Sequence, residues 1–356
     1  MSVNENIPNA ILLAAANAEA ERKKEIATAH FNLSETLRHL RDACIKEIRS
    51  AIDPEKLQDY EKAREMARQR FREVAAATLP TTESLKQAAE LRRQISNEGK
   101  QFVDGLGIDA KKIRGIQEKY ASEAESLVKR TLLLEEEAPY VEVSAEKAPT
   151  LSHNPWEWRS PPYAGDASGY WQLYTTTPPV YPHHYENRLT GEISLSSRMW
   201  VPDADDSDLS YTEIVSYHTF WYLMPAAGLL EVWLLLEAAE TYYGGCLDDE
   251  WGVSNARVLQ RSRPFLLTRG RQRFATLLEY DRGNVEGCWS HLIAPPGGQR
   301  WVHLFSLDPF AQGEWVSGSV GISDFNYFWV NDMSCSLILT SRWVLKQIVM
   351  RSTGAP

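Results

Sequence analysis

The sequence predicts an α+β protein of more than one domain, in which a heptad-patterned helical bundle or coiled coil precedes an antiparallel, jelly-roll-like β-sandwich. Apolar residues recur at three-, four- and seven-residue steps before about residue 140, and at every second residue after about residue 190. All 12 tryptophans lie at or beyond Trp156. Residues 1–140 carry 23 Lys and Arg against 24 Asp and Glu, whereas residues 141–356 carry 15 against 24. The spacing of apolar residues and the amino-acid composition therefore change in the same region, as expected at a domain boundary.

Residues 1–138 are predicted to form the helical domain. Three breaks, at 53–55, 79–82 and 104–109, divide the apolar pattern into four stripes. At the first break Asp53 can cap a helix, and Pro54 suits the first helical position because the N–H that it lacks would have no partner there. The stripes are narrow and rich in alanine, which is typical of coiled-coil seams. We expect an antiparallel bundle or long helical hairpins within one chain, with assembly between copies of the chain as the extension.

Residues 139–190 are predicted to form a proline- and aromatic-rich strap that packs on the β domain, with an edge strand at 170–175. Residues 191–356 are predicted to form the β-sandwich recognition domain. Alternating burial recurs there at 193–201, 231–237, 274–280 and 337–345, separated by turn sequences rich in Gly, Pro, Asn and Asp. Short strands without intervening helices favour an antiparallel sandwich.

An acidic loop is the candidate metal site of the sequence. Crowded carboxylates on a loop are what Ca²⁺ prefers, but the glycine and distant glutamate of an EF-hand loop are missing, and a solvated turn is the simpler interpretation. The candidate ligands are Asp203, Asp205, Asp206 and Asp208. Ca²⁺ is the one cofactor for which the sequence offers ligands; otherwise we expect none.

Three arginines at alternate positions form the candidate anion site. Arg269, Arg271 and Arg273 would share one face of a strand, where their guanidinium groups could clamp a phosphate, sulfate or carboxylate. Ion pairing with acidic turns of the same domain, or of a neighbouring subunit, is the competing interpretation.

Two tryptophans are candidates for a ligand platform or a second buried interface. Most tryptophans are expected to fill the sandwich, but Trp200 and Trp233 fall on the face opposite the apolar stripe of their own strands. His183 and His184 resemble half of a metal site, yet neighbouring residues of an extended chain point in opposite directions. No familiar nucleophile or phosphate-binding motif is present, so we assign no catalytic residue.

Net charge, hydrophobic segments and cysteine content limit the classes of partner and the cellular compartment that we expect. A net charge of -10 argues against nucleic-acid binding, because phosphate contacts require surplus Lys and Arg. No secretory signal or membrane-spanning segment is recognisable, so we expect synthesis in the cytoplasm; release by lysis or by a dedicated secretion machine would leave the same sequence. The four cysteines lack a disulfide or CxxC pattern and are expected to be reduced.

The sequence therefore favours a non-enzymatic structural and recognition protein. It would form a homo-oligomer through its helices and bind a receptor, glycan or partner protein through its Trp-rich β domain. One alternative is a pore-forming or membrane-acting, toxin-like effector, and membrane contact is expected under this alternative alone. The other is a glycan-active hydrolase with two acids within about 10 Å of each other in the β domain.

Overall fold

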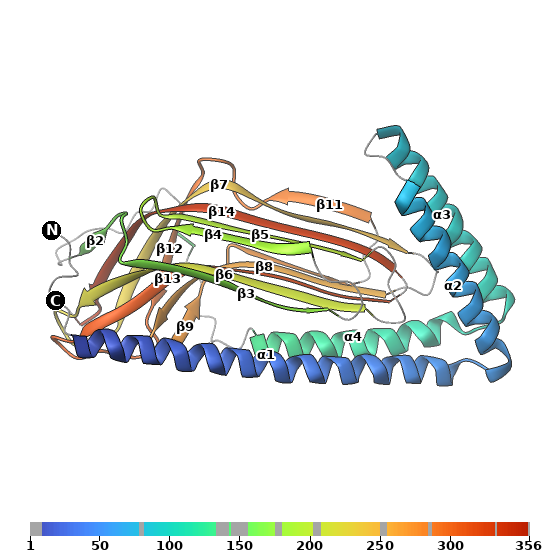
Figure 1. Ribbon diagram of the computed structural model, residues 1–356, viewed down its shortest axis with the longest axis horizontal. Coiled ribbons are helices and arrows are strands. Elements are labelled where there is room, and N and C mark those ends of the chain that lie inside the picture. Colours follow the sequence, from blue (N-terminus) through green and yellow to red (C-terminus); the bar gives the residue numbers. More distant parts are fainter. Residues whose placement is uncertain are drawn as a thin grey trace.

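The architecture consists of two antiparallel β-sheets and two pairs of helices (Figure 1). The computed structural model describes residues 9–77, 82–132, 142–143, 156–174, 180–201, 208–249, 255–283, 287–331 and 333–354. The helices are α1 (Asn9–Ala51), α2 (Pro54–Ala77), α3 (Thr82–Gly105) and α4 (Ala110–Leu132). In this described part of the chain, no helix contains an apolar stretch long enough to cross a bilayer.

The first sheet, here called sheet A, has the strand order β1-β12-β7-β14-β5-β4, with β11 paired to β7 and β2 paired to β14. The second, sheet B, has the order β10-β8-β13-β6-β3, with β9 paired to β8. The bounds in sheet A are β1 Glu142–Val143, β2 Glu157–Arg159, β4 Val180–Asn187, β5 Glu192–Val201, β7 Leu230–Asp249, β11 Gly287–Leu292, β12 Gln299–Phe305 and β14 Met333–Ser352. Those in sheet B are β3 Gly165–Tyr174, β6 Asp208–Leu223, β8 Asn255–Thr268, β9 Arg271–Phe274, β10 Leu278–Gly283 and β13 Trp315–Asn331.

The helices form two antiparallel pairs. Helix α1 packs against α4, and α2 packs against α3. The α1–α4 pair lies along the outer face of sheet B, whereas the α2–α3 hairpin extends away from the end of the sandwich (Figure 1). A single hydrophobic cluster contains residues of both the helices and sheet B: Leu33, Leu37, Cys44, Ala121, Ala124, Val128, Leu209, Tyr211, Leu259, Phe325, Tyr327 and Trp329. Sheet B is therefore covered on both faces.

A buried polar contact fixes α1 on sheet B. His30 Nδ1 lies 2.7 Å from the Tyr211 hydroxyl, its Nε2 lies 3.5 Å from Glu213 Oε2, and its ring stacks on Trp171 at 5.3 Å. Burial would raise the pKa of the Glu213 carboxyl, but the hydrogen bond from His30, the charges of His30 and Arg263 and the Ser323 hydroxyl together hold this pKa below its usual value. A buried carboxylate is stable only when it is paired in this way.

The mixed helical and β architecture with a sandwich is confirmed. The helices form two pairs, and coiled-coil packing is not shown among them. The apolar stripes of α1 and α4 are divided between each other and sheet B, which explains why they are narrow. The strap supplies β1, β2, β3 and β4, with β3 at an edge of sheet B. The domain boundaries remain a prediction.

The sandwich interior contains a polar layer. Gln260 Nε2 donates to Asn326 Oδ1 at 2.9 Å and to the Ile338 carbonyl at 2.9 Å, and the Ser262 and Ser341 hydroxyls lie 3.0 Å apart. Fully buried Asp324 lies near this serine pair. Burial raises the pKa of its carboxyl to about 7, with Ser262 and Ser341 acting in the opposite direction.

Two of the four cysteines are joined, so the expectation of reduced cysteines is wrong for this pair. Cys246 of β7 and Cys288 of β11 lie directly opposite each other in the antiparallel register and form a disulfide. Cys44 and Cys335 are free and buried. The spacing of 42 residues gave no signal, because the pairing depends on strand register rather than on a sequence motif.

We predict that Asp324→Asn stabilises the protein at pH 8 but not at pH 4. Because the pKa is raised in the folded state, the folded protein retains a proton that the unfolded chain loses. The stability contributed by the acid form is full at low pH and is lost as the pH rises towards 7. Urea unfolding should show a gain on the order of 1–3 kcal/mol at pH 8. Exposed Asp59→Asn is the control, and equal effects of Asp324→Asn at both pH values would contradict the prediction.

Candidate functional site

The outer face of sheet A is the candidate binding surface. The α1–α4 pair covers sheet B on the opposite side of the sandwich, so the helices leave this face of sheet A open (Figure 1). A groove of about 500 Å³ lies on it. Strands β4, β5, β14 and β7 supply its lining: His183, Tyr185, Glu192, Ser194, Ser196, Glu240, Tyr242, Thr340 and Arg342. Alternation along each strand places these side chains on one face, while their neighbours fill the core.

Charged residues in the groove form one connected group. Arg342 Nη1 donates to Glu240 Oε2 at 3.1 Å, and Arg342 Nη2 lies 3.7 Å from Glu192 Oε1. Beside them, the hydroxyls of Ser196 and Thr340 lie 3.2 Å apart. The side chains of Arg342 and Glu240 are 44% and 50% exposed, so their remaining donors and acceptors can reach a ligand. The groove therefore presents both hydrogen-bond donors and hydrogen-bond acceptors on a rigid sheet.

The two adjacent histidines point to opposite sides of β4, as an extended chain requires. His183 lines the groove, whereas His184 Nδ1 lies 2.6 Å from the Ser168 hydroxyl on β3. They do not form a shared metal site. Among the described residues, no group of three or more His, Cys, Asp or Glu side chains could hold a metal ion.

Trp233 lies on the outer face of sheet A, as its position in the sequence predicts, but only 9% of it is exposed. It packs with Trp301, Val349 and Trp156, and its ring stacks on His303 at 3.9 Å. This cluster lies where β2 continues the sheet along β14. Side chains of the sheet and the strap therefore cover Trp233.

Glu231 is the polar centre of this tryptophan cluster. Its Oε1 accepts from Trp233 Nε1 at 3.0 Å and contacts His303 Nε2 at 2.8 Å, and its Oε2 accepts from Arg351. Burial would raise the pKa of this carboxyl, but the three partners outweigh burial and hold the pKa at about 2. The Arg351 guanidinium also lies over the Trp156 ring at 4.4 Å, which ties the strap to the sheet.

Trp200 lies near the end of β5, where its backbone is opposite Ser336 of β14. Its side chain is outside the described residues. Of the predicted calcium loop, Asp203, Asp205 and Asp206 also lie outside the described residues. Asp208 begins β6 and is 1% exposed.

The three candidate arginines are separated by a turn. Arg269 and Gly270 have φ values of 50° and 75° and connect β8 to β9, so Arg271 and Arg273 lie on β9 while Arg269 does not. Arg269 pairs with Glu314, and Arg271 Nη1 bonds Asp308 Oδ1 at 2.6 Å. The intradomain ion pairs are present for these two arginines, although their partners differ from the acidic turns noted in the sequence.

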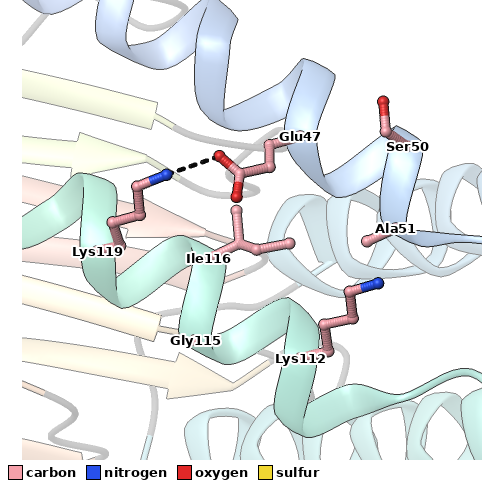
Figure 2. Close-up of a pocket in the computed structure, with 7 residues that line it drawn as sticks. All are labelled: Glu47, Ser50, Ala51, Lys112, Gly115, Ile116 and Lys119. Carbon is pink, nitrogen blue, oxygen red and sulfur yellow. Dashed lines mark hydrogen bonds and ion pairs between the residues drawn. The ribbon is translucent and has the colours of Figure 1, made fainter.

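A second groove, of about 520 Å³, lies between α1 and α4. Figure 2 shows Glu47 of α1 directed towards Lys119 of α4, while Lys112 lies at the other end. Lys119 Nζ and the Tyr120 hydroxyl donate to Glu47 Oε2 at 2.9 and 2.8 Å, and these bonds lower the pKa of the Glu47 carboxyl. The contacts of Glu47 with Lys119 and Tyr120 link the two helices across this groove.

Comparisons with known proteins leave the family open. No protein-family model and no curated protein match the sequence. Solved structures that align with part of the chain include TmCBM61 in complex with β-1,4-galactotriose, at 7% identity and a TM-score of 0.12, over 47% of this chain and 86% of the other. Another is the C-terminal family 22 carbohydrate-binding module of Clostridium thermocellum Xyn10B, at 13% identity and a TM-score of 0.12. This alignment covers 60% of this chain and 97% of the other.

The enzymatically active domain of tailspike protein 4 of bacteriophage CBA120 aligns at 10% identity and a TM-score of 0.11, over 51% of this chain and 18% of the other. Alignments of this quality transfer neither a fold nor a ligand. Any function must therefore be argued from the chain's own residues.

Sequence reasoning missed the groove. Ser194 and Arg342 lie on the polar side of strands whose alternation was recognised, but polar outward residues occur on every exposed strand. Tyr185 lies in the strap, outside the predicted sandwich. The signal that could have found the site is the gathering of these side chains on neighbouring strands, which requires the strand order.

We predict that Glu231→Gln destabilises the protein by about 1–3 kcal/mol at pH 7, because buried donors lose their charged acceptor. The wild-type pKa is lowered on folding, so the stability that this carboxylate contributes is present above pH 4.5 and declines as the pH falls towards 2. Chemical unfolding at pH 7 and pH 3 should show a smaller difference between variant and wild type at pH 3. Glu35→Gln, in an exposed ion pair, is the control; a penalty that does not change with pH would contradict the assignment.

Proposed function

We propose that this protein is a non-enzymatic recognition protein that binds a glycan on the outer face of sheet A and self-assembles through its helices. The observation that carries the proposal is the groove on the sheet face that the helices leave open. It combines two tyrosines with hydroxyl, carboxylate and guanidinium groups. Tyrosine offers a flat apolar face together with a polar tip, which suits a sugar ring with its hydroxyls.

A glycan suits the groove better than a protein partner does. A stable protein interface usually needs about 800 Å² on each side, with an apolar centre. The lining of the groove is polar, and Tyr185 is its large exposed aromatic side chain, at 43%. A polar groove lined by two tyrosines matches a chain of hydroxyl-bearing rings.

The absence of catalysis is part of the proposal. Glu192 and Glu240 are the carboxylates of the groove, and Arg342 lies between them and contacts both. A glycosidase holds the scissile bond in the space between its two carboxyl groups. Here a guanidinium occupies that space, which supports binding without cleavage; oligosaccharides recovered unchanged after prolonged incubation would agree with this.

We predict that Tyr185→Ala and Glu240→Gln each weaken glycan binding about tenfold, because each removes a stacking or hydrogen-bonding partner worth roughly 1 kcal/mol or more. A glycan array identifies ligands, and calorimetry measures the affinities of the variants. Tyr170→Ala is the matched control, since Tyr170 is 45% exposed on β3 and lies outside the groove. Arg271→Ala tests the arginine cluster separately. If Arg271→Ala lost glycan binding while the groove variants kept the wild-type affinity, the binding site would be assigned to β9 instead of the groove.

We predict that the full chain is an oligomer held together by the α2–α3 hairpin. This hairpin extends from the body and exposes Met66 and Leu91, at 53% and 48% (Figure 1). Burying these side chains against another copy would be favourable, and a charge at either position would oppose it. Light scattering should show Met66→Glu and Leu91→Glu shifting the mass towards that of one chain. A monomeric wild-type protein would contradict the assembly half of the proposal.

A further inference from the structure

Apart from Glu192, the groove residues fall into two rows that run across the strands. In the first row the successive cross-strand neighbours are Tyr185, Ser194, Arg342 and Glu240. In the second row they are His183, Ser196, Thr340 and Tyr242. Each row therefore contains one residue from each of β4, β5, β14 and β7. The long axis of the recognition surface is perpendicular to the strands.

The length of the rows sets the size of the ligand. From β4 to β7 there are three inter-strand spacings, or about 14 Å in total. Tyr185 lies at the β4 end and Tyr242 at the β7 end. Leu292 of β11 lies opposite Tyr242 and is 62% exposed, which extends the apolar surface at that end. One sugar ring is too short to contact both tyrosines, whereas a short oligosaccharide reaches from one to the other.

The charged side chains of the groove determine the chemical character of the ligand. Arg342 is the arginine of the groove lining, and its guanidinium already faces two carboxylates. An acidic sugar would have to compete with Glu192 and Glu240 for this guanidinium. Sugar hydroxyls need no such exchange, because a carboxylate has about four acceptor positions and each ion pair uses one of them.

We infer that the groove binds an uncharged linear oligosaccharide lying across β4, β5, β14 and β7. Its end rings pack on Tyr185 and Tyr242. The hydroxyls of its central rings bond Arg342 and the Ser196–Thr340 pair, and those of the ring at the β7 end bond Glu240. This inference rests on the proposed glycan-binding function and specifies the length, direction and charge of the glycan.

The test is a length series measured on the full chain. Cello-, xylo-, manno- and β-1,4-galacto-oligosaccharides of one to six units are titrated by calorimetry, with oligoglucuronates as the acidic counterpart. In the series that binds, affinity should rise by about tenfold or more from the disaccharide to the tetrasaccharide and then level off, as each new ring meets a further part of the row. Tyr185→Ala should remove the last step of this rise and leave the disaccharide affinity within about twofold of wild type.

Tyr170→Ala is the control and should preserve the whole length dependence. A monosaccharide that binds as tightly as the tetrasaccharide would overturn the inference while leaving glycan recognition intact. If the oligoglucuronates bound more tightly than every neutral series, the inference would also be overturned, because it requires an uncharged ligand. Failure of every series to bind would overturn both the inference and the proposed function.

Discussion

The packing of α1 and α4 on sheet B is the constraint on which the rest of the molecule depends. The buried contacts of His30 with Tyr211 and Glu213 fix the helix on the sheet, and the shared hydrophobic cluster surrounds them. Buried polar groups of this kind must be satisfied, so they favour one placement of the helix over displaced ones. Because the helices occupy this side of the sandwich, the outer face of sheet A is the large sheet surface left for a ligand (Figure 1).

The rigidity of sheet A makes that surface useful. Long strands β7 and β14 pair along most of their length, and the groove rows cross them at their centre. At one end of the same face, Glu231 and the tryptophan cluster fasten the strap to β14. The groove side chains are therefore held on a scaffold fixed from both the core and the strap, which reduces the entropy lost when a ligand binds.

The sequence predicted some elements of the structure better than others. The seven-residue pattern around Leu33 and Leu37 predicted a helix, and the helix is present, but the pattern did not reveal that its partner is a sheet. Trp233 was recognised as facing away from the core, yet its burial depends on Trp156 of the strap and Trp301 of β12. Arg269 was assigned to a strand because alternation alone cannot show a two-residue turn. Tyr185 and Arg342 carried no signal, since 157 residues separate them in the chain.

The sequence by itself determined the local conformations: helices before the strap, strands after it and, where burial alternates regularly, the side of the strand that enters the core. These follow from the repeat of burial along the chain, which is a property of neighbouring residues. Only the tertiary structure decided which faces are covered, which strands are adjacent and which side chains form the groove. Those outcomes depend on strand order and register, which bring together residues from distant parts of the chain and which no short-range pattern encodes.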